Sequence, residues 1–452
     1  MKDQDIHSDA LVNVEIADEN EQESLMAIET DSPKEDILAI CLFFVLIAST
    51  TFAGIYGPSL YNNEVYKFKF GNSPNHIFRQ HIHGITAQNQ FYIMQLSFSV
   101  SPDKAEEAKI PISFNYLILF ESSKGEELNR ESGSINNDVI LQKGSATTEQ
   151  LHFFFDRYIS YDQIDIRIDF DSCKGLDEAI LTTTYGDGSH LRYQLYLRLL
   201  FGLATLVIFI LYYSRLSSIP RNKWLLEQKL TFCLQIFSFI GSNPLYFLYL
   251  KMPSVFQDIV NSLFYRSFTC FVFFYILVII DNVQKSEVIK SNFYSFFLPK
   301  IVFFSLQLIC EIAYPIMYHG LSSLDVEAMP HTVVNFFKFV RILFNVCFSV
   351  WFVYLTVMDF LKVDSTQLLK VKIYSTVFGA TVLINLCDVF LTDVDLFRNN
   401  SGLFSLSFSS LFAFVILMVF FHWPYETSID QQYNDPEDDD KPNNIFESDD
   451  GK

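Results

Sequence analysis

The sequence predicts a multi-pass α-helical membrane protein, with one N-terminal helix plus a seven-helix bundle and an inserted luminal antiparallel β-sandwich domain. Three observations support this fold class. Eight apolar runs are each long enough to cross a bilayer. The long interval between the first two runs alternates apolar and polar residues, as strands do. The net charge of −20 is concentrated in two short terminal segments, so the apolar middle is nearly neutral.

Each apolar run holds about 20 mostly apolar residues, the length that spans the hydrocarbon core. The predicted spans are Ile37–Tyr56, Leu195–Tyr213, Leu230–Leu250, Ile259–Ile280, Phe297–Tyr318, Val333–Phe360, Ile373–Leu391 and Leu403–Trp423. A cleaved signal peptide begins with a short basic segment, whereas a long acidic segment precedes the first run. We therefore interpret the first run as a signal anchor.

The two ends of the chain are strongly acidic. Residues 1–36 contain 12 acids and two lysines, and residues 425–452 contain ten acids and two lysines. Such segments bury too little apolar surface to offset the entropy of ordering, so we expect both to be disordered. The predicted domains are an acidic cytosolic tail at 1–36, the anchor at 37–56, the β-sandwich at 57–193, the bundle at 195–423 and a second tail at 424–452.

Lysines and arginines in the short loops predict the orientation of the chain in the membrane, because short loops rich in these residues stay in the cytosol. The loops 214–229, 282–292 and 362–372 carry nine of them, whereas the alternate loops carry only Lys251 and Arg398. Both termini are therefore predicted to be cytosolic and the β-domain luminal. The acidic composition argues against nucleic acid as a partner, since nucleic acid requires a basic surface.

The region 57–193 is predicted to be an antiparallel sandwich of short strands separated by polar links such as Ser122–Asn137. The expected strands are Glu64–Phe70, Gln90–Val100, Ile112–Glu121, Gln150–Asp156, Gln163–Asp171 and Ala179–Tyr185. Cys173 is the one cysteine in this region, so an internal disulfide is excluded. His81 and His83 share one strand face, and without a third ligand we interpret them as a surface pair rather than a metal site.

Short motifs in this order resemble the Wntless and transmembrane protein 181 group of seven-helix trafficking proteins with a luminal domain. The resemblance covers 37–425 in layout and rests on Asn243-Pro244-Leu245-Tyr246, Phe297-Leu298-Pro299-Lys300, Phe91-Tyr92-Ile93-Met94-Gln95-Leu96, Val371-Lys372-Ile373 and His422-Trp423-Pro424-Tyr425. Wntless has cysteine pairs in its luminal domain, and this chain departs from that pattern. The resemblance implies a trafficking or cargo receptor that binds a luminal, lipidated or amphipathic cargo.

Ionisable residues inside the predicted spans are candidate functional groups, because charge within the bilayer is costly unless it is paired or hydrated. Glu311 lies near mid-bilayer, and we expect it to face a polar cavity that opens to the lumen. It would be paired with Arg341 there, or protonated and hydrogen-bonded. The remaining charges lie closer to the luminal surface, where anchoring is the favoured interpretation; they are Arg198, Arg266, Lys338 and Asp388.

Two proline motifs also fall at spans. Asn243-Pro244 interrupts the third span, because proline removes a backbone donor and disfavours helix at the preceding residue. This motif predicts a structural kink, and the functional alternative is a kink that widens a cavity facing the lumen. Lys300 follows Pro299 at the start of the fifth span, and we expect it to reach the cytosolic headgroups. Asn399 opens the sequon Asn399-Asn400-Ser401, a candidate glycosylation site beside the last span.

The sequence carries no recognisable catalytic motif, so we expect no enzyme and predict neither cofactor nor metal. The cluster Asp435–Asp440 is either a solvated tail or a sorting signal for cytosolic coat adaptors. Besides a cargo receptor in the Golgi, the endosome or the plasma membrane, two other functions stay open. They are a signalling receptor of the G-protein-coupled type and an ion channel or transporter that uses Glu311 and Arg341.

Overall fold

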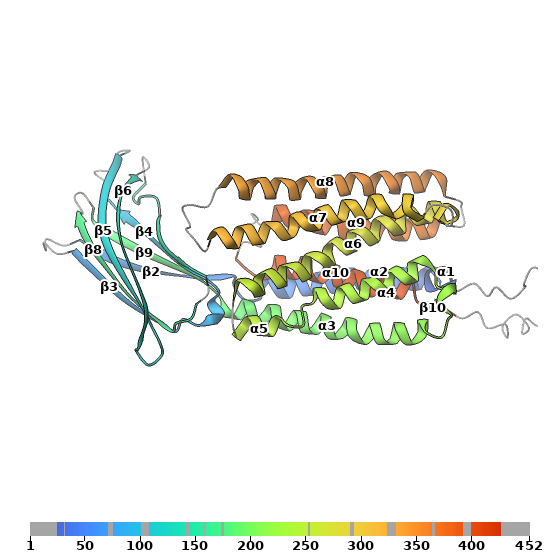
Figure 1. Cartoon of the computed structure of the whole chain (residues 1–452), viewed down its shortest axis with the longest axis horizontal. Coiled ribbons are helices and arrows are strands. Elements are labelled where there is room, and N and C mark those ends of the chain that lie inside the picture. Colours follow the sequence, from blue (N-terminus) through green and yellow to red (C-terminus); the bar gives the residue numbers. More distant parts are fainter. Residues whose placement is uncertain are drawn as a thin grey trace, which may run out of the picture.

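A computed structural model describes the chain at residues 25–30, 32–70, 76–100, 108–141, 145–157, 159–172, 176–251, 254–289, 293–322, 331–363, 367–391 and 399–425. The molecule is elongated, with the β-sandwich at one end and the helices side by side at the other (Figure 1). Most of the two segments that were expected to be disordered tails (1–36 and 424–452) lies outside the described residues, at 1–24 and 426–452. Cys173 also lies outside the described residues.

Eight helices of the described chain are long and apolar enough to cross a membrane, and each coincides with one predicted span. The helices are α1 Ala27–Thr30, α2 Pro33–Ile55, α3 Gly188–Leu216, α4 Leu226–Gly241, α5 Tyr246–Lys251, α6 Val255–Ile289, α7 Phe293–Ser322, α8 His331–Lys362, α9 Leu368–Leu391 and α10 Gly402–Phe421, with short 3-10 turns η1 Ala87–Asn89 and η3 Arg221–Lys223. The protein is an integral membrane protein with one N-terminal spanning helix and a seven-helix bundle.

The β-domain between α2 and α3 is a sandwich of two four-stranded antiparallel sheets, with strand orders β2-β9-β4-β7 and β3-β8-β5-β6. Its strands are β2 Tyr61–Lys69, β3 His76–His83, β4 Tyr92–Ser99, β5 Ala108–Glu121, β6 Glu127–Leu141, β7 Leu151–Asp156, β8 Gln163–Ser172 and β9 Glu178–Gly186. The core lies between the sheets, where alternate residues of β8 (Ile164, Ile166 and Ile168) are fully buried.

The sequence prediction missed two strands. The segment Ser122–Asn137, expected to be a polar link, is a tight turn followed by most of β6, which pairs with β5 along its whole length. β6 is an edge strand whose residues are nearly all exposed until Val139, so it lacks the apolar alternation of a half-buried strand. β3 pairs with β8 at the other sheet edge, and its His81 and His83 project from the same face.

Helix α10 lies at the centre of the bundle and is buried on nearly every side. α2 packs along it so closely that a Cβ at Gly54 would approach the carbonyl oxygen of Ser401 to 2.8 Å and would also overlap the side chain of Ser405. Small residues allow such approaches between helices in membranes. The N-terminal spanning helix is therefore part of the bundle rather than a detached anchor.

The third span is broken where the sequence predicted a kink. Helix α4 ends at Gly241, Asn243 has a positive φ of 50°, and α5 begins at Tyr246 beyond Pro244. The side-chain amide of Asn243 donates a 3.1 Å hydrogen bond to the Oδ1 atom of Asn261 on α6. The break places the short helix α5 beside the β-domain end of the bundle (Figure 1).

Candidate functional site

A cavity of about 600 Å³ lies inside the bundle in the half nearer the β-domain. Its lining comes from α3, α6, α7, α8, α9 and α10, with Leu60 and Asn400 added from the links next to the β-domain. The lining combines aromatic rings with amides and charged groups, which is the composition of a pocket for an organic ligand.

The carboxylate of Glu311 on α7 lies between two arginines at this cavity. Its Oε2 atom is 3.3 Å from Nε of Arg266 on α6, and its Oε1 atom is 3.1 Å from Nε of Arg341 on α8. The Glu311 side chain is 8% exposed, against 28% and 29% for the two arginines. One buried acid thus joins three helices, and the ion cluster carries a net positive charge.

Uncharged amides surround this ion cluster. Gln307 precedes Glu311 by one turn of α7, and Asn345 follows Arg341 by one turn of α8, so each pair shares a helix face. Asn385 adds a third amide from α9, and all three line the cavity. The prediction overlooked these amides because it considered only charged residues. For Gln307 and Asn345, the spacing of four residues from a charged residue within an apolar run was the available signal.

A chain of hydrogen bonds runs along the side of the cavity formed by α3. Nδ1 of His190 lies 2.8 Å from the Ser401 hydroxyl, and its Nε2 lies 2.7 Å from Nε2 of Gln194. The hydroxyl of Tyr246 on α5 donates to Oε1 of Gln194 at 2.6 Å. The guanidinium of Arg198 stacks on the Tyr246 ring, with its carbon 4.5 Å from the ring centroid.

The β-domain contacts the cavity wall through an ion pair. Nη2 of Arg157, which follows β7, lies 3.5 Å from Oδ2 of Asp258 near the start of α6. Asp258 itself lines the cavity. A displacement of the β-domain would therefore act directly on a residue of the cavity lining.

The structure brings together some of the candidate residues and separates others. Arg266 was expected to anchor at the headgroups, and this expectation is wrong, because the side chain turns inward to Glu311. Asn243 and Pro244 lie outside the cavity lining, and Asn243 reaches it only through Asn261. The remaining two candidates, Lys338 on α8 and Asp388 on α9, have side chains outside the described part of the structure.

The expectation that Lys300 reaches the headgroups is also wrong. Its ammonium group is 2.6 Å from Oδ2 of Asp281 on α6, donates to the carbonyl oxygen of Phe296 and lies over the Phe296 ring. Both charged side chains are almost fully buried, at 3% and 6% exposure. This buried ion pair holds α7 against α6 in the half of the bundle away from the cavity.

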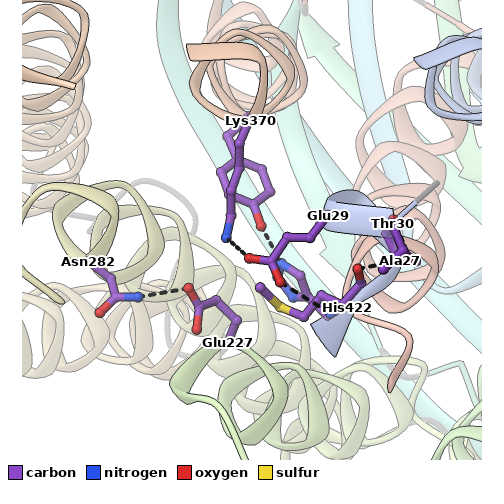
Figure 2. A network of polar contacts seen from close by, with 9 residues as sticks. Ala27, Glu29, Thr30, Glu227, Asn282, Lys370 and His422 are labelled. Atoms are coloured by element: carbon purple, nitrogen blue, oxygen red, sulfur yellow. Dashed lines mark hydrogen bonds and ion pairs between the residues drawn. The ribbon is translucent and has the colours of Figure 1, made fainter. Parts of the chain in front are cut away.

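The bundle end farthest from the β-domain is closed by both termini of the described chain (Figure 1). The two-residue strand β1 (Leu25–Met26) pairs with β10 (Pro424–Tyr425). Lys370 reaches Glu29 at 2.9 Å, and Asn282 donates to Glu227 at 2.8 Å, as Figure 2 shows. Segment 25–30, which was expected to belong to a disordered tail, is thus ordered.

The buried ring of His422 connects the helices at this end. Its Nδ1 atom lies 2.6 Å from the Thr231 hydroxyl on α4 and 2.9 Å from the Tyr275 hydroxyl on α6, and its Nε2 atom lies 2.7 Å from the Tyr374 hydroxyl on α9. The hydroxyl of Tyr212 on α3 donates to the His422 carbonyl oxygen. His422, from the motif that ends the last span, therefore hydrogen-bonds to four helices, α3, α4, α6 and α9.

Two candidate surface sites can be placed in the structure. The rings of His81 and His83 are 4.0 Å apart, and Asp165 is 3.9 Å from His81. No group of three or more metal-binding side chains occurs within the described residues. Asn399 is exposed and its Oδ1 atom accepts from the backbone N–H of Tyr61, while the Ser401 hydroxyl of the same sequon is buried against the carbonyl oxygen of Pro58.

A family model described as "Wntless-like, transmembrane domain" matches residues 187–426, from the start of α3 to just beyond β10. The match therefore includes every helix that lines the cavity, and it excludes the β-domain and α2. No curated protein matches the chain.

Proposed function

This integral membrane protein belongs to the Wntless-like transmembrane domain family, and we propose that it is a trafficking receptor of the secretory pathway. In this proposal the protein binds a luminal, lipidated or amphipathic cargo through its β-domain and its bundle cavity. It carries the cargo between membranes without chemically changing it. Both termini then face the cytosol, which agrees with the distribution of lysine and arginine in the loops.

The observation that carries the proposal is the cavity around Glu311. Four helices of the bundle, α3, α6, α7 and α8, each supply a charged group to its wall, although an apolar wall would cost less free energy in a membrane. Ion pairs and amides inside a span mark binding or transport pathways more often than scaffolding. The cavity also adjoins the β-domain, so a cargo protein held by that domain could insert a lipid or an amphipathic segment between the helices.

The contact between Arg157 and Asp258 supports a joint action of the two parts. This ion pair connects the β-domain to the cavity wall, so cargo bound at the β-domain can change the position of α6. The acidic cluster Asp435–Asp440, which lies outside the described residues, is the proposed sorting signal that coat adaptors bind. Adaptor proteins recognise such clusters through basic pockets.

The test is proximity labelling with a peroxidase fused separately to the C-terminal tail and to the turn between β5 and β6. This turn is exposed, and Gly125 has a positive φ of 77° with open space around it, so an insertion there is tolerable. We expect the tail fusion to label coat adaptors and the turn fusion to label secreted or lipidated proteins. A matched control carries the peroxidase on an unrelated resident protein of the same membrane.

Two other outcomes would contradict the proposal. Labelling of G proteins by the tail fusion, without coat proteins and without luminal clients, would favour a signalling receptor. If neither fusion labels such partners and the purified protein conducts ions in a planar bilayer, a channel or transporter becomes the better explanation. In that case the current should fall in the Glu311→Gln variant.

A further inference from the structure

Arg198 is a buried cation for which the described part of the chain supplies no anion. The residue lies on α3 with 5% of its surface exposed, and it lines the cavity. Its Nε and Nη1 atoms have no hydrogen-bond partner among the described residues. A guanidinium has five donors in a fixed fork, and burial without acceptors is costly. The side chain is therefore positioned for an acceptor that the described residues do not provide.

The rings around Arg198 hold it in place without neutralising it. The guanidinium carbon lies 4.5 Å from the centroid of the Tyr246 ring, 5.5 Å from that of Phe404 and 5.2 Å from that of Phe408. Rings attract a cation through their faces, but they accept no in-plane hydrogen bond. The edges of the guanidinium, which bind carboxylate and phosphate oxygens, are left for another group.

The acids of the cavity wall are already paired elsewhere. Glu311 is held between Arg266 and Arg341, and Asp258 is held by Arg157 of the β-domain. The neighbouring polar groups are also engaged, because Oε1 of Gln194 accepts from the Tyr246 hydroxyl. Among the described residues, three arginines and two acids line the cavity, and these five groups together carry an excess of positive charge.

We propose that Arg198 is an anion-binding residue, which takes the carboxylate or phosphate of an amphiphile whose apolar chain occupies the cavity. Arginine binds either group through two parallel hydrogen bonds. Aromatic rings of the cavity lining, those of Tyr265, Phe273 and Phe404, supply an apolar wall, and a volume of about 600 Å³ falls within the range of small-ligand pockets. The inference requires only the cavity, so it stands or falls separately from the trafficking role.

The test measures equilibrium binding of radiolabelled oleate to the full-length protein in dodecyl maltoside, with binding to empty micelles subtracted. The variants are Arg198→Gln, Arg198→Lys and, as a matched control on the same helix, the exposed Arg192→Gln. We expect Arg198→Gln to bind oleate at least tenfold more weakly than the wild type, Arg198→Lys to retain part of the affinity, and Arg192→Gln to bind normally.

Competition on the wild-type protein identifies the source of the anion and does not depend on any variant folding. If dioleoyl phosphatidate displaces oleate and inorganic phosphate does not, the site takes a lipid headgroup. If inorganic phosphate displaces oleate as well, it takes a free anion. Oleyl alcohol has the same chain without the charge and should compete at least tenfold less well than unlabelled oleate. Equal competition by oleyl alcohol, or wild-type affinity in a folded Arg198→Gln, would leave Arg198 as a structural cation only and overturn the proposal.

Discussion

Replacement of Glu311 by glutamine should destabilise the bundle strongly, because it leaves two arginines close together without their shared acid. Removing one partner of a buried ion pair costs about 3–5 kcal/mol. The arginines here are 28% and 29% exposed, so water screens part of this cost and the lower end of the range applies. A loss of about 3 kcal/mol corresponds to a fall of roughly 6–12 °C in the unfolding midpoint of a bundle of this size.

A double-mutant cycle isolates the contribution of the ion pair. Thermal unfolding is measured for Glu311→Gln, Arg341→Gln and the double variant in the same detergent. The double variant should be at least about 1 kcal/mol more stable than the sum of the two single effects predicts, because only Arg266, and no longer Arg341, then lacks the acid. The exposed pair formed by Glu127 and Arg130 is the control, with side chains 47% and 69% exposed and an expected coupling of about 0–0.5 kcal/mol.

Additive effects would refute the reasoning. If the double variant at Glu311 and Arg341 loses the sum of the single losses to within about 0.5 kcal/mol, the residues are not energetically coupled. The cavity would then be hydrated enough for each charge to be solvated on its own.

Three further variants test other contacts by thermal unfolding. Lys300→Met should cost about 3–5 kcal/mol because it strands the buried Asp281, and adding Asp281→Leu should recover most of the loss; a double variant no more stable than Lys300→Met would contradict this. His422→Ala should cost about 2–4 kcal/mol by leaving buried hydroxyls without a partner, and a loss below about 1 kcal/mol would show that water replaces the ring. Gly54→Leu should cost about 1–3 kcal/mol by forcing α2 away from Ser401, which caps α10, and from Ser405 on α10; unchanged stability would contradict the close approach.

The membrane-spanning helices were predictable from sequence because the bilayer imposes a single strong constraint. Every spanning backbone must satisfy its hydrogen bonds internally, so each span is an apolar helix of a known length. The break at Asn243-Pro244 was predictable for a similar local reason. Strand β6 was not predictable, because an exposed edge strand buries neither face and shows no alternation of apolar and polar residues.

Charged partners were harder to predict than the spans that carry them. Glu311 and Arg341 could be matched because both lie deep within their helices. Arg266 could not, since its depth alone fitted an anchor at the headgroups, and only the packing of α6 against α7 and α8 turns it inward. The partner of Lys300 was not predicted for a similar reason. Asp281 falls between the predicted span that ends at Ile280 and the predicted loop that begins at 282, so it was not considered as a buried acid.

The most direct test of the central claim is site-specific photocrosslinking in living cells. Benzoylphenylalanine replaces Tyr265, which lines the cavity on α6, and in a matched control it replaces Tyr196, which is 66% exposed on the outside of α3. The account predicts that only the probe at 265 captures secretory-pathway proteins or their lipid modifications. It is contradicted if both positions capture the same bulk lipids and no cargo, because the cavity would then offer nothing that the outer surface of the bundle lacks.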